Sequence, residues 1–296
     1  MDVRAIAMGL LFAFIWSSAF TSARIIVADA PPFAISAIRF AIAGLIGVAI
    51  ARALGQSWHL TRAQWRATLI FGLCQNALYL GLNFKAMTTV QASLASIIAS
   101  TMPLIVAFLG WAVLRERLRP MAAFGLILGF AGVIVIMSGR IEQGVDITGV
   151  LLGVIAALAL AVATLMVRSA SSGGNLMMIV GLQMFVGAAV LFVASLLLET
   201  WTFNWNWRMG TALIYTILAP GLLATWVWFT LVARIGAVKA ATFHFLNPFF
   251  GVAVAAVVLG ESLGMMDIIG VAVIAAGILA VQLSKQTGSR TPGPAR

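Results

Sequence analysis

The segment 101-TMPLIVAFLGWAVLRERL-118 recurs in altered form 145 residues later, as 246-LNPFFGVAVAAVVLGESL-263. Each copy has a proline inside a long apolar run and a glutamate where that run closes, and glycines fall at matching places in the next apolar run. The matched pairs are Pro103 and Pro248, Glu116 and Glu261, Gly125 and Gly270, and Gly132 and Gly277. A repeat without a gap between its landmarks indicates two related halves, which we place at residues 1–142 and 143–284.

The composition is that of a polytopic membrane protein. Of the 296 residues, 62% are hydrophobic and only 9% are charged, whereas soluble domains carry about 25% charged residues. The net charge of +10 comes from basic residues dotted between apolar segments, so it does not indicate nucleic-acid binding. Cys74 is the only cysteine, which excludes an intrachain disulfide and a cysteine-based metal cluster. We expect neither a cofactor nor a metal.

Ten apolar segments are long enough to cross a bilayer, since a membrane helix needs about 20 apolar residues. They predict helices over residues 5–27, 33–53, 65–86, 91–114 and 119–138, and over 148–170, 176–199, 209–232, 238–260 and 265–284. The first resembles a signal peptide, but it is long enough to span and nine similar segments follow, so we interpret it as the first helix. Residues 285–296 are polar and basic and are predicted to form a disordered cytoplasmic tail. The predicted fold class is an all-α polytopic membrane protein.

The basic residues predict how the chain is oriented. With the N-terminus inside, the inner segments hold thirteen Lys and Arg residues and the outer segments hold four. The positive-inside bias therefore places both termini in the cytoplasm. Because five is odd, the second five-helix repeat enters the membrane from the opposite side, so the repeats are inverted. Inverted repeats give a transporter two nearly equivalent packings with a site near the midplane, and this predicts alternating access.

Polar side chains inside the apolar segments recur at helical spacing. A polar group in hydrocarbon is costly, so such groups usually face protein or a wet cavity. Ser93, Ser96 and Ser100 share one helix face, and Asn76, Tyr79 and Asn83 form a similar stripe. We hypothesise that these faces surround one central substrate cavity walled by aromatic residues. Its predicted lining is Trp16, Ser17, Asn76, Tyr79, Asn83, Ser96, Ser100, Thr164, Trp226, His244 and Asn247.

These residues also have structural interpretations, which the sequence leaves open. Serines at helical spacing are common as small packing residues in membrane helices. Tryptophan near a helix end is usually an interfacial anchor, although Trp16 and Trp226 lie deeper. His244 could line the cavity, carry a proton, or be a satisfied structural histidine. Arg39 lies in the middle of the second helix, where a structural partner or a substrate contact would account for its cost.

Two prolines and a set of glycines predict features of the helices themselves. Pro103 and Pro248 each remove one backbone hydrogen bond and should kink their helices. Because freed carbonyls need partners in lipid, matched kinks in both halves mark the site, unless they serve packing alone. The fifth and tenth helices are predicted to pack closely against each other through their glycines. These are Gly125, Gly129, Gly132, Gly270 and Gly277.

The sequence resembles the EamA-type exporters of the drug/metabolite transporter superfamily from Met1 to about Ser284. The resemblance rests on IWSSAF at 15–20, AIRF at 37–40, YLGLNFKAM at 79–87, and the two copies quoted above. It implies ten helices in two inverted five-helix EamA repeats, and alternating access. It also implies export of small metabolites from a bacterial cytoplasm across the inner membrane. Within the superfamily the chain looks most like amino-acid exporters of the YddG type. Trp16 and Arg39 have no counterparts in the second half, where Ala161 and Met184 stand.

The leading functional hypothesis is a secondary exporter of aromatic and other neutral amino acids. Asn76, Tyr79, Ser96 and Asn247 would hold the zwitterion, in a cavity that requires no oligomer. The nearer alternative is export of lipophilic or quaternary-ammonium drugs, because aromatic faces can hold a cation. No HExxH, P-loop or paired deep carboxylates occur, so metalloprotease, ATP-driven and acid-relay mechanisms lack their residues. A membrane-embedded enzyme and a pigment bound through Lys85 are the remaining, weaker alternatives.

Overall fold

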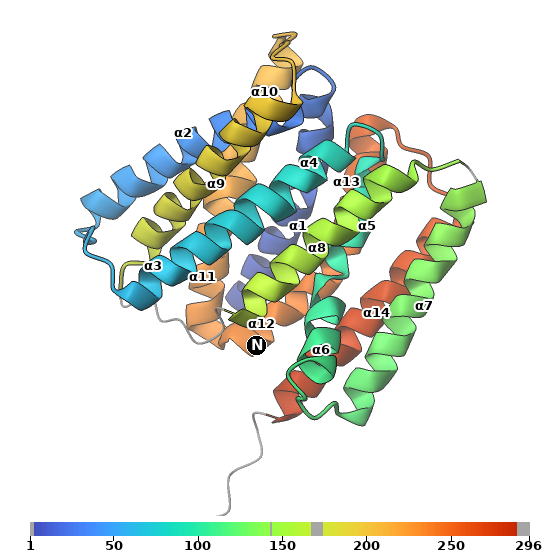
Figure 1. Cartoon of the computed structure of the whole chain (residues 1–296). Coiled ribbons are helices and arrows are strands. Elements are labelled where there is room, and N and C mark those ends of the chain that lie inside the picture. The colour runs from blue at the N-terminus through green and yellow to red at the C-terminus, as the bar shows by residue number, and fades with distance from the viewer. Residues whose placement is uncertain (1–2, 143, 167–173, 289–296) are drawn as a thin grey trace, which may run out of the picture.

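The computed structural model describes residues 3–142, 144–166 and 174–288, and in these ranges the chain is helical with no strand. Ten of its helices are long and apolar enough to span a membrane. The protein is therefore an all-helical membrane protein with ten candidate spans, as the apolar segments predict (Figure 1). Each predicted segment overlaps one observed span. Inside a membrane there is no water to bind the backbone N–H and C=O groups, so an apolar run satisfies them by forming a helix.

The first half supplies five spans, two of which are interrupted. The elements are α1 (Val3–Val27), α2 (Pro32–Ala53), a third span built from α3 (Arg62–Phe71), η1 (Gly72–Gly81) and α4 (Leu82–Ala86), a fourth built from α5 (Ala92–Ser100) and α6 (Met102–Ala112), and α7 (Pro120–Glu142). η1 is a π-helical segment, in which the hydrogen bonds reach five residues instead of four.

The second half repeats this arrangement. The elements are α8 (Ile147–Met166), α9 (Leu176–Leu198), an eighth span built from α10 (Trp207–Thr216), η2 (Ile217–Leu223) and α11 (Ala224–Ile235), a ninth built from α12 (Ala237–Ala241), η3 (Thr242–Leu246) and α13 (Asn247–Leu259), and α14 (Met265–Gly288). α14 continues through residues 285–288, which the sequence analysis assigns to the tail, because nothing at 285 breaks the helix. Residues 289–296 of the predicted tail, and 167–170 of the predicted sixth helix, lie outside the described residues.

The interruptions recur at matching positions in the two halves. The π segments η1 and η2 begin at Gly72 and Ile217, which are 145 positions apart, the period of the sequence repeat. Pro103 and Pro248 each lie in the first turn of a new helical segment, α6 and α13. Proline is tolerated there because the first backbone N–H groups of a helix have no intrahelical partner. A new helical segment therefore begins at each of these prolines, at places the repeat shares, while the predicted kinks stay a prediction.

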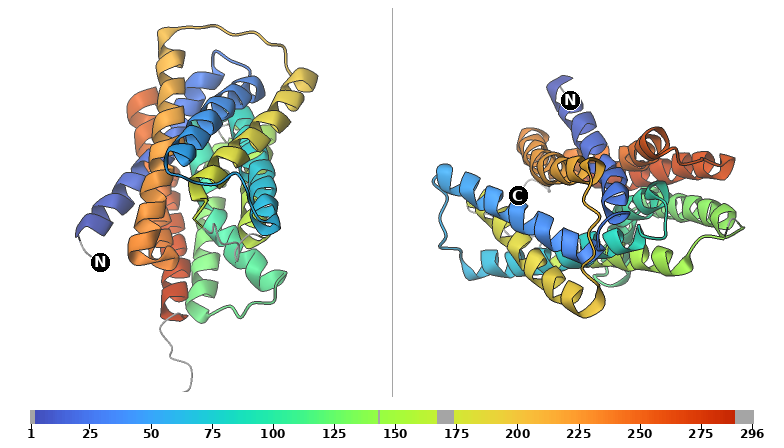
Figure 2. Two further views of the ribbon diagram at one scale, coloured as in Figure 1. Left: turned by 90° about the vertical axis from the view of Figure 1, so that its left-hand side faces the viewer. Right: turned by 90° about the horizontal axis from the view of Figure 1, so that it is seen from above.

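Matched helices of the two halves pack side by side. α2 lies along α9, and α7 lies along α14, as Figures 1 and 2 show. The α7–α14 contact depends on glycine, because a Cβ placed on Gly277 would lie 2.6 Å from the Gly125 oxygen. A Cβ on Gly132 would likewise lie 2.9 Å from the Gly270 oxygen. The prediction that the glycine-bearing fifth and tenth helices pack against each other is confirmed.

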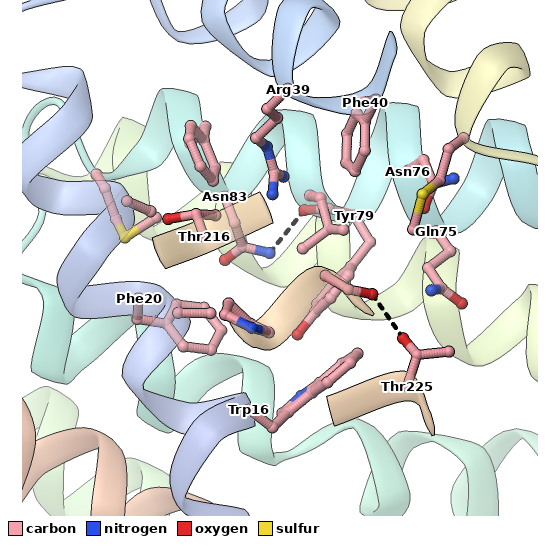
Figure 3. Close-up of a pocket in the computed structure, with 18 residues that line it drawn as sticks. Trp16, Phe20, Arg39, Phe40, Gln75, Asn76, Tyr79, Asn83, Thr216 and Thr225 are labelled. Atoms are coloured by element: carbon pink, nitrogen blue, oxygen red, sulfur yellow. Dashed lines mark hydrogen bonds between the residues drawn. The ribbon is translucent and has the colours of Figure 1, made fainter. Parts of the chain in front are cut away.

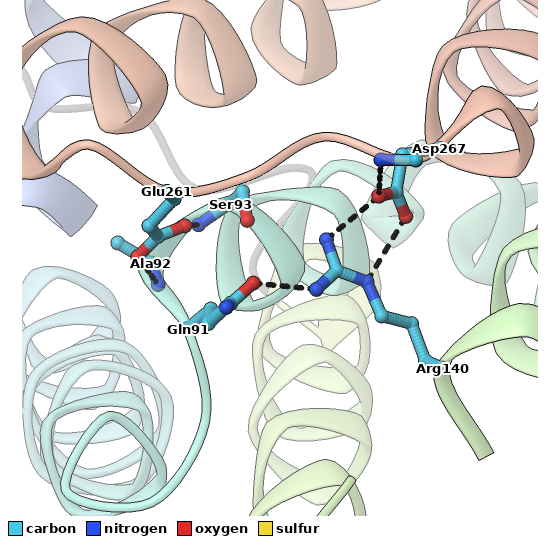
Figure 4. Close-up of polar contacts among 7 residues, drawn as sticks. Gln91, Ala92, Ser93, Arg140, Glu261 and Asp267 are labelled. Atoms are coloured by element: carbon cyan, nitrogen blue, oxygen red, sulfur yellow. Dashed lines mark hydrogen bonds and ion pairs between the residues drawn. The ribbon is translucent and has the colours of Figure 1, made fainter. Parts of the chain in front are cut away.

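Carboxylates from the second half cap two helices of the first half. The Glu261 carboxylate accepts hydrogen bonds from the backbone N–H groups of Ala92 and Ser93, at 2.7 and 2.9 Å, at the start of α5 (Figure 4). Glu199 does the same for Phe33 and Ala34 at the start of α2, with both distances 2.9 Å. A carboxylate at a helix N-terminus satisfies orphan donors and opposes the positive end of the helix dipole. These caps join the two repeats at the end predicted to face outside.

A buried ion pair lies beside these caps. Arg140 of α7 and Asp267 of α14 approach to 2.9 Å, and both side chains are about as buried as core residues. Arg140 also donates to the Gln91 side chain, and the Asp267 carboxylate accepts from the Gly264 backbone (Figure 4). A charge pair in an apolar environment is tolerated only when its remaining polar atoms are also hydrogen-bonded, and this network meets that requirement.

Candidate functional site

A cavity lies between the two halves, walled by helices from both (Figure 3). The first half contributes α1, α2, η1 and α4, and the second contributes α9, α10, η2 and α11. Its main lining residues are Trp16, Phe20, Arg39, Phe40, Asn76, Tyr79, Asn83, Phe84, Met184, Thr216 and Thr225. The lining is largely aromatic and aliphatic, with a few polar groups, which is the usual make-up of a small-molecule site.

The two π segments both border this cavity. η1 brings Gln75, Asn76 and Tyr79 to it, and η2 brings Pro220 and Gly221. Pro220 has no backbone N–H and therefore cannot continue an ordinary α-helical ladder. Single π turns inside helices occur frequently at functional sites, and here the repeat places one on each side of the same cavity.

Asn76 holds η1 against the second half. Its side-chain amide donates to the Gln183 carbonyl of α9 at 2.9 Å. α9 approaches this closely because Gly187 has no side chain; a Cβ there would lie 2.3 Å from the Asn76 Cβ. Asn76 borders the cavity, and one of its two amide N–H groups is already occupied by the protein.

Tyr79 and Asn83 lie one helical turn apart on the cavity wall. The Asn83 amide nitrogen donates to the Tyr79 carbonyl at 2.7 Å, which fixes the direction of the side chain (Figure 3). The Asn83 Oδ1 atom is buried and has no hydrogen-bond partner among the described residues. A buried acceptor without a partner costs about 1–3 kcal/mol, so this atom is suited to accept a hydrogen bond from a ligand.

Arg39 points from α2 into the same space (Figure 3). Its side chain is only 6% exposed, and its guanidinium carbon lies 4.1 Å from the Phe40 ring centre and 4.3 Å from that of Phe84. Its Nε and Nη2 atoms are buried without hydrogen-bond partners in the described part of the chain. Among the described lining residues Arg39 is the one that carries a charge. The structure therefore shows no protein carboxylate on Arg39 within the described ranges.

Trp16 and Phe20 of α1 form the opposite, aromatic side of the cavity (Figure 3). Thr225 of α11 lies beyond them, with its hydroxyl donating to the Gly221 carbonyl at 2.8 Å. Met184 of α9 also borders the cavity, and it stands 145 residues after Arg39. The repeat therefore brings two matched positions to one cavity: Arg39, which is a cation, and Met184, which is uncharged.

Of the eleven residues predicted to line one cavity, four border the cavity described here and seven lie elsewhere. Trp16, Asn76, Tyr79 and Asn83 border the cavity. Ser17 and Ser96 instead lie in the contact of α1, α5 and α13, where a Cβ on Gly251 would be 1.8 Å from the Ser96 Oγ. Ser100 donates back to the Ser96 carbonyl at 2.7 Å. Small side chains at helical spacing serve close packing here, the structural interpretation that the sequence leaves open.

The remaining predicted residues lie elsewhere for separate reasons. Thr164 donates to its own helix at the Leu160 carbonyl, 2.7 Å away. Trp226 is 56% exposed and lies on the outer surface. His244 forms ring contacts with Phe12 and Trp228, with centroids 5.3 and 5.1 Å apart, and its Nδ1 is 3.0 Å from the Asn247 amide nitrogen. Neither His244 nor Asn247 is among the residues that line this cavity.

Sequence reasoning missed several residues that complete the wall. Phe40 and Phe84 follow Arg39 and Asn83 directly in the chain, but phenylalanine in an apolar run carries no signal of its own. Met184 could have been found, because the repeat aligns it with Arg39. Pro220 could also have been found as a second helix-breaking residue deep in the eighth span.

Comparison with known proteins identifies the two halves. Residues 3–138 and 147–283 each match the model of the EamA-like transporter family. YvbV, an uncharacterised transporter of Bacillus subtilis, is 28% identical over 276 residues, covering 92% of this chain and 90% of its own. The aromatic amino acid exporter YddG of Ancylobacter novellus is 29% identical over 110 residues, which is 37% of this chain and 38% of YddG. One solved crystal structure superposes with a TM-score of 0.65 at 20% identity, covering 97% of this chain and 99% of the other.

Proposed function

Because the chain belongs to the EamA-like transporter family, we propose that this membrane transporter exports aromatic and other neutral amino acids from the cytoplasm by alternating access. The observation that carries the proposal is the cavity between the two halves, which combines aromatic walls with a few hydrogen-bonding groups. A zwitterionic substrate needs both donors and acceptors, and its side chain needs apolar surface. The cavity offers all three.

The inverted repeats support the proposal of alternating access. Two related halves of opposite orientation can pack in two nearly equivalent ways, each opening the midplane site to one side. The interrupted spans support this motion, because η1 and η2 stand at matching positions and both border the cavity. Helices of a single chain line the cavity, so the proposal requires no oligomer.

The amino-acid class is favoured by the chemistry of the wall. Trp16, Phe20 and Tyr79 offer flat apolar surface for an aromatic or aliphatic side chain. The partial similarity to an aromatic amino acid exporter supports the same class over about a third of the chain. Relatives that match nearly the full length are described only as transporters, so they do not narrow the substrate.

The alternative substrate is a lipophilic or quaternary-ammonium drug, which aromatic rings could bind by cation–π contact. The lining residues disfavour it. The described lining contains Arg39 and no Asp or Glu, so a second cation would enter a site that already holds an unneutralised positive charge. Like charges in a medium of low dielectric repel strongly.

The proposed location is a bacterial inner membrane with both termini in the cytoplasm. The basis is the excess of Lys and Arg in the segments between alternate helices. Three of the thirteen inner basic residues, Arg168, Arg290 and Arg296, lie outside the described residues. With this topology, export requires that the cytoplasm supply the substrate.

The test is efflux from liposomes that contain the purified protein. The liposomes are loaded with a labelled amino acid panel or, separately, with a labelled organic cation, and no ion gradient is imposed. Saturable efflux of neutral and aromatic amino acids is expected. Efflux of the cation together with no amino-acid efflux would overturn the proposal in favour of drug export.

A pair of variants tests whether this cavity is the route. Tyr79→Ala removes a buried wall residue and should abolish most amino-acid efflux. Asn247→Ala, outside the cavity, should keep efflux above half of the wild-type rate at equal reconstitution. Equal loss in both variants, or none in either, would show that the cavity assignment is wrong.

A further inference from the structure

We propose that Arg39 binds the carboxylate of the substrate and that Asn83 accepts a hydrogen bond from its ammonium group. The cavity would thereby select zwitterionic α-amino acids over amines and organic cations. This inference deepens the proposed function and rests on it, because it assigns the two poles of an amino acid to two named side chains.

Arg39 has the properties of a ligand-binding cation. A charge inside a membrane protein is costly and is normally neutralised by a partner. Here the guanidinium lies against the rings of Phe40 and Phe84, while Nε and Nη2 remain buried without a partner in the described residues. Stacking on ring faces leaves the planar edge of the guanidinium, which carries the N–H donors, available. That edge faces the cavity (Figure 3).

The geometry of the edge favours a carboxylate. The guanidinium fork presents parallel N–H groups that match two carboxylate oxygens, and such charge-assisted pairs are the stronger class of hydrogen bond. A phosphate dianion is less suitable. Arg39 is the one charged residue among the described lining, so it would neutralise only one of the two negative charges and the other would be buried without a partner. A single negative charge balances a single guanidinium.

Asn83 supplies the complementary group. Its Nδ2 is engaged by the Tyr79 carbonyl, so its Oδ1 is the free end of the amide, and that atom is buried without a partner in the described part of the chain. Arg39 and Asn83 face the same space from α2 and α4 (Figure 3). An unsatisfied donor edge and an unsatisfied acceptor in one cavity match a ligand that is both anion and ammonium donor. An amine would leave Arg39 unpaired, and a simple acid would leave Asn83 unpaired.

The first test uses the wild-type protein and four related compounds. These are phenylalanine, its amide, phenethylamine and phenylpropionate, used as competitors for efflux of labelled phenylalanine from liposomes. Loss of the carboxylate should weaken competition at least about tenfold, since a hydrogen bond to a charged group contributes about 1.5–3 kcal/mol. Phenylpropionate, which lacks the ammonium group, should lose less of its ability to compete. Equal competition by the amide, the amine and phenylalanine would overturn the inference and leave amino-acid export standing.

A second measurement does not depend on transport. Ligands that bind only the folded state raise the melting temperature of the purified protein. Phenylalanine should stabilise the wild type in detergent, and phenethylamine should not. Stabilisation by phenethylamine or by an organic cation, with none by phenylalanine, would overturn both the inference and the proposed function.

Variants of Arg39 complete the test. Arg39→Met keeps the length and removes the donors, so the KM for phenylalanine should rise at least about tenfold. The preference over phenethylamine should fall by a similar factor. Arg39→Lys should recover part of the affinity. Ser36→Ala, one turn earlier on α2 and outside the cavity lining, is the matched control and should behave as wild type. An unchanged KM in Arg39→Met would overturn the inference; if that variant does not fold, the wild-type analogue series decides.

Discussion

Two tryptophans show how one residue type has different roles in this protein. Trp16 of α1 is half-buried and borders the cavity, whereas Trp226 of α11 is 56% exposed on the outer surface. Both lie deep within their spans, and in the sequence they carry the same signal. Their positions differ because Trp16 lies on the face of its helix that borders the cavity, whereas Trp226 lies on the outer face of its helix. If the cavity is the substrate site, as we propose, only Trp16 is placed to contact a substrate.

Substitution of these tryptophans should therefore have unequal effects. Trp16→Ala removes apolar surface from the wall, and burial of an aromatic side chain contributes about 1.5–3 kcal/mol. The KM for aromatic amino acids should rise roughly tenfold, with a smaller rise for alanine. Trp226→Ala should leave both KM values unchanged. Kinetics of efflux from liposomes measure this, and a larger effect of Trp226→Ala than of Trp16→Ala would contradict the site.

His244 is the second residue whose role depends on its surroundings. It lies half-buried between Phe12 and Trp228 and bonds Asn247, away from the cavity lining. A side chain that does not border the substrate path has no direct route for exchanging a proton with the substrate. We interpret it as a structural residue that joins α1 to the ninth and eighth spans.

The pH profile of transport tests that interpretation. In His244→Gln the profile of efflux rate between pH 5 and 8, the range in which an unperturbed histidine titrates, should match the wild type. The melting temperature should fall by only a few degrees, since glutamine can keep one hydrogen bond to Asn247. Loss of a pH-dependent step in the variant, at equal protein stability, would assign His244 a part in proton coupling.

At the scale of the elements, two features recur in both halves: interruptions within spans, and glycines at which helices pack closely. η1 and η2 begin 145 residues apart and both border the cavity, and each proline of the repeated segment opens a new helical turn. α7 and α14, by contrast, are uninterrupted and pack glycine to glycine. The irregular third and eighth spans thus border the cavity, and α7 and α14 form a straight, close-packed pair at one side, as Figure 1 shows.

The glycine contact gives a prediction for stability. In Gly277→Ala the new Cβ would lie 2.6 Å from backbone atoms of Gly125 and Gly129, so α7 and α14 must move apart. Overpacking of this kind costs about 1–3 kcal/mol. The matched control is Gly139→Ala on α7, where a Cβ would be 3.4 Å from the Met266 side chain, an ordinary contact. Thermal unfolding in detergent should show a lower melting temperature for Gly277→Ala only.

At the scale of the whole molecule, two inverted halves are fastened by contacts that cross between them. Matched helices pack together, as α2 does with α9, and carboxylates of the second half cap α2 and α5 of the first. The cavity lies between the halves and takes its lining from both. A relative movement of the halves would therefore change access to the cavity without unfolding any span.

The orientation of the molecule can be tested with reporter fusions. Thirteen basic residues on one side against four on the other predict that both termini face the cytoplasm. A fluorescent protein fused after residue 296 should be fluorescent, because it folds in the cytoplasm. Alkaline phosphatase inserted at Gly144, between α7 and α8, should be active, because that enzyme requires the outer side. A non-fluorescent C-terminal fusion together with inactive alkaline phosphatase at Gly144 would show that the predicted topology is inverted.

The sequence by itself determined the fold class, the ten spans to within a few residues, and the α7–α14 contact. Each is encoded locally or by the repeat: the length of an apolar run sets a span, and glycine at helical spacing sets a close approach. The sequence also identified Arg39 as unusual, because placing a charge in the middle of a membrane helix is energetically costly.

Only the tertiary structure decided which face of each helix borders the cavity. The lipid and the protein interior are both apolar, so a membrane helix lacks the amphipathic periodicity that tells the inner face of a soluble helix from the outer. Ser96 and Asn83 are equally polar in the sequence, but one lies in a helix contact and the other borders the cavity. Whether Arg39 has a partner depends on helices far apart in the chain, and their packing alone leaves its donors facing the cavity.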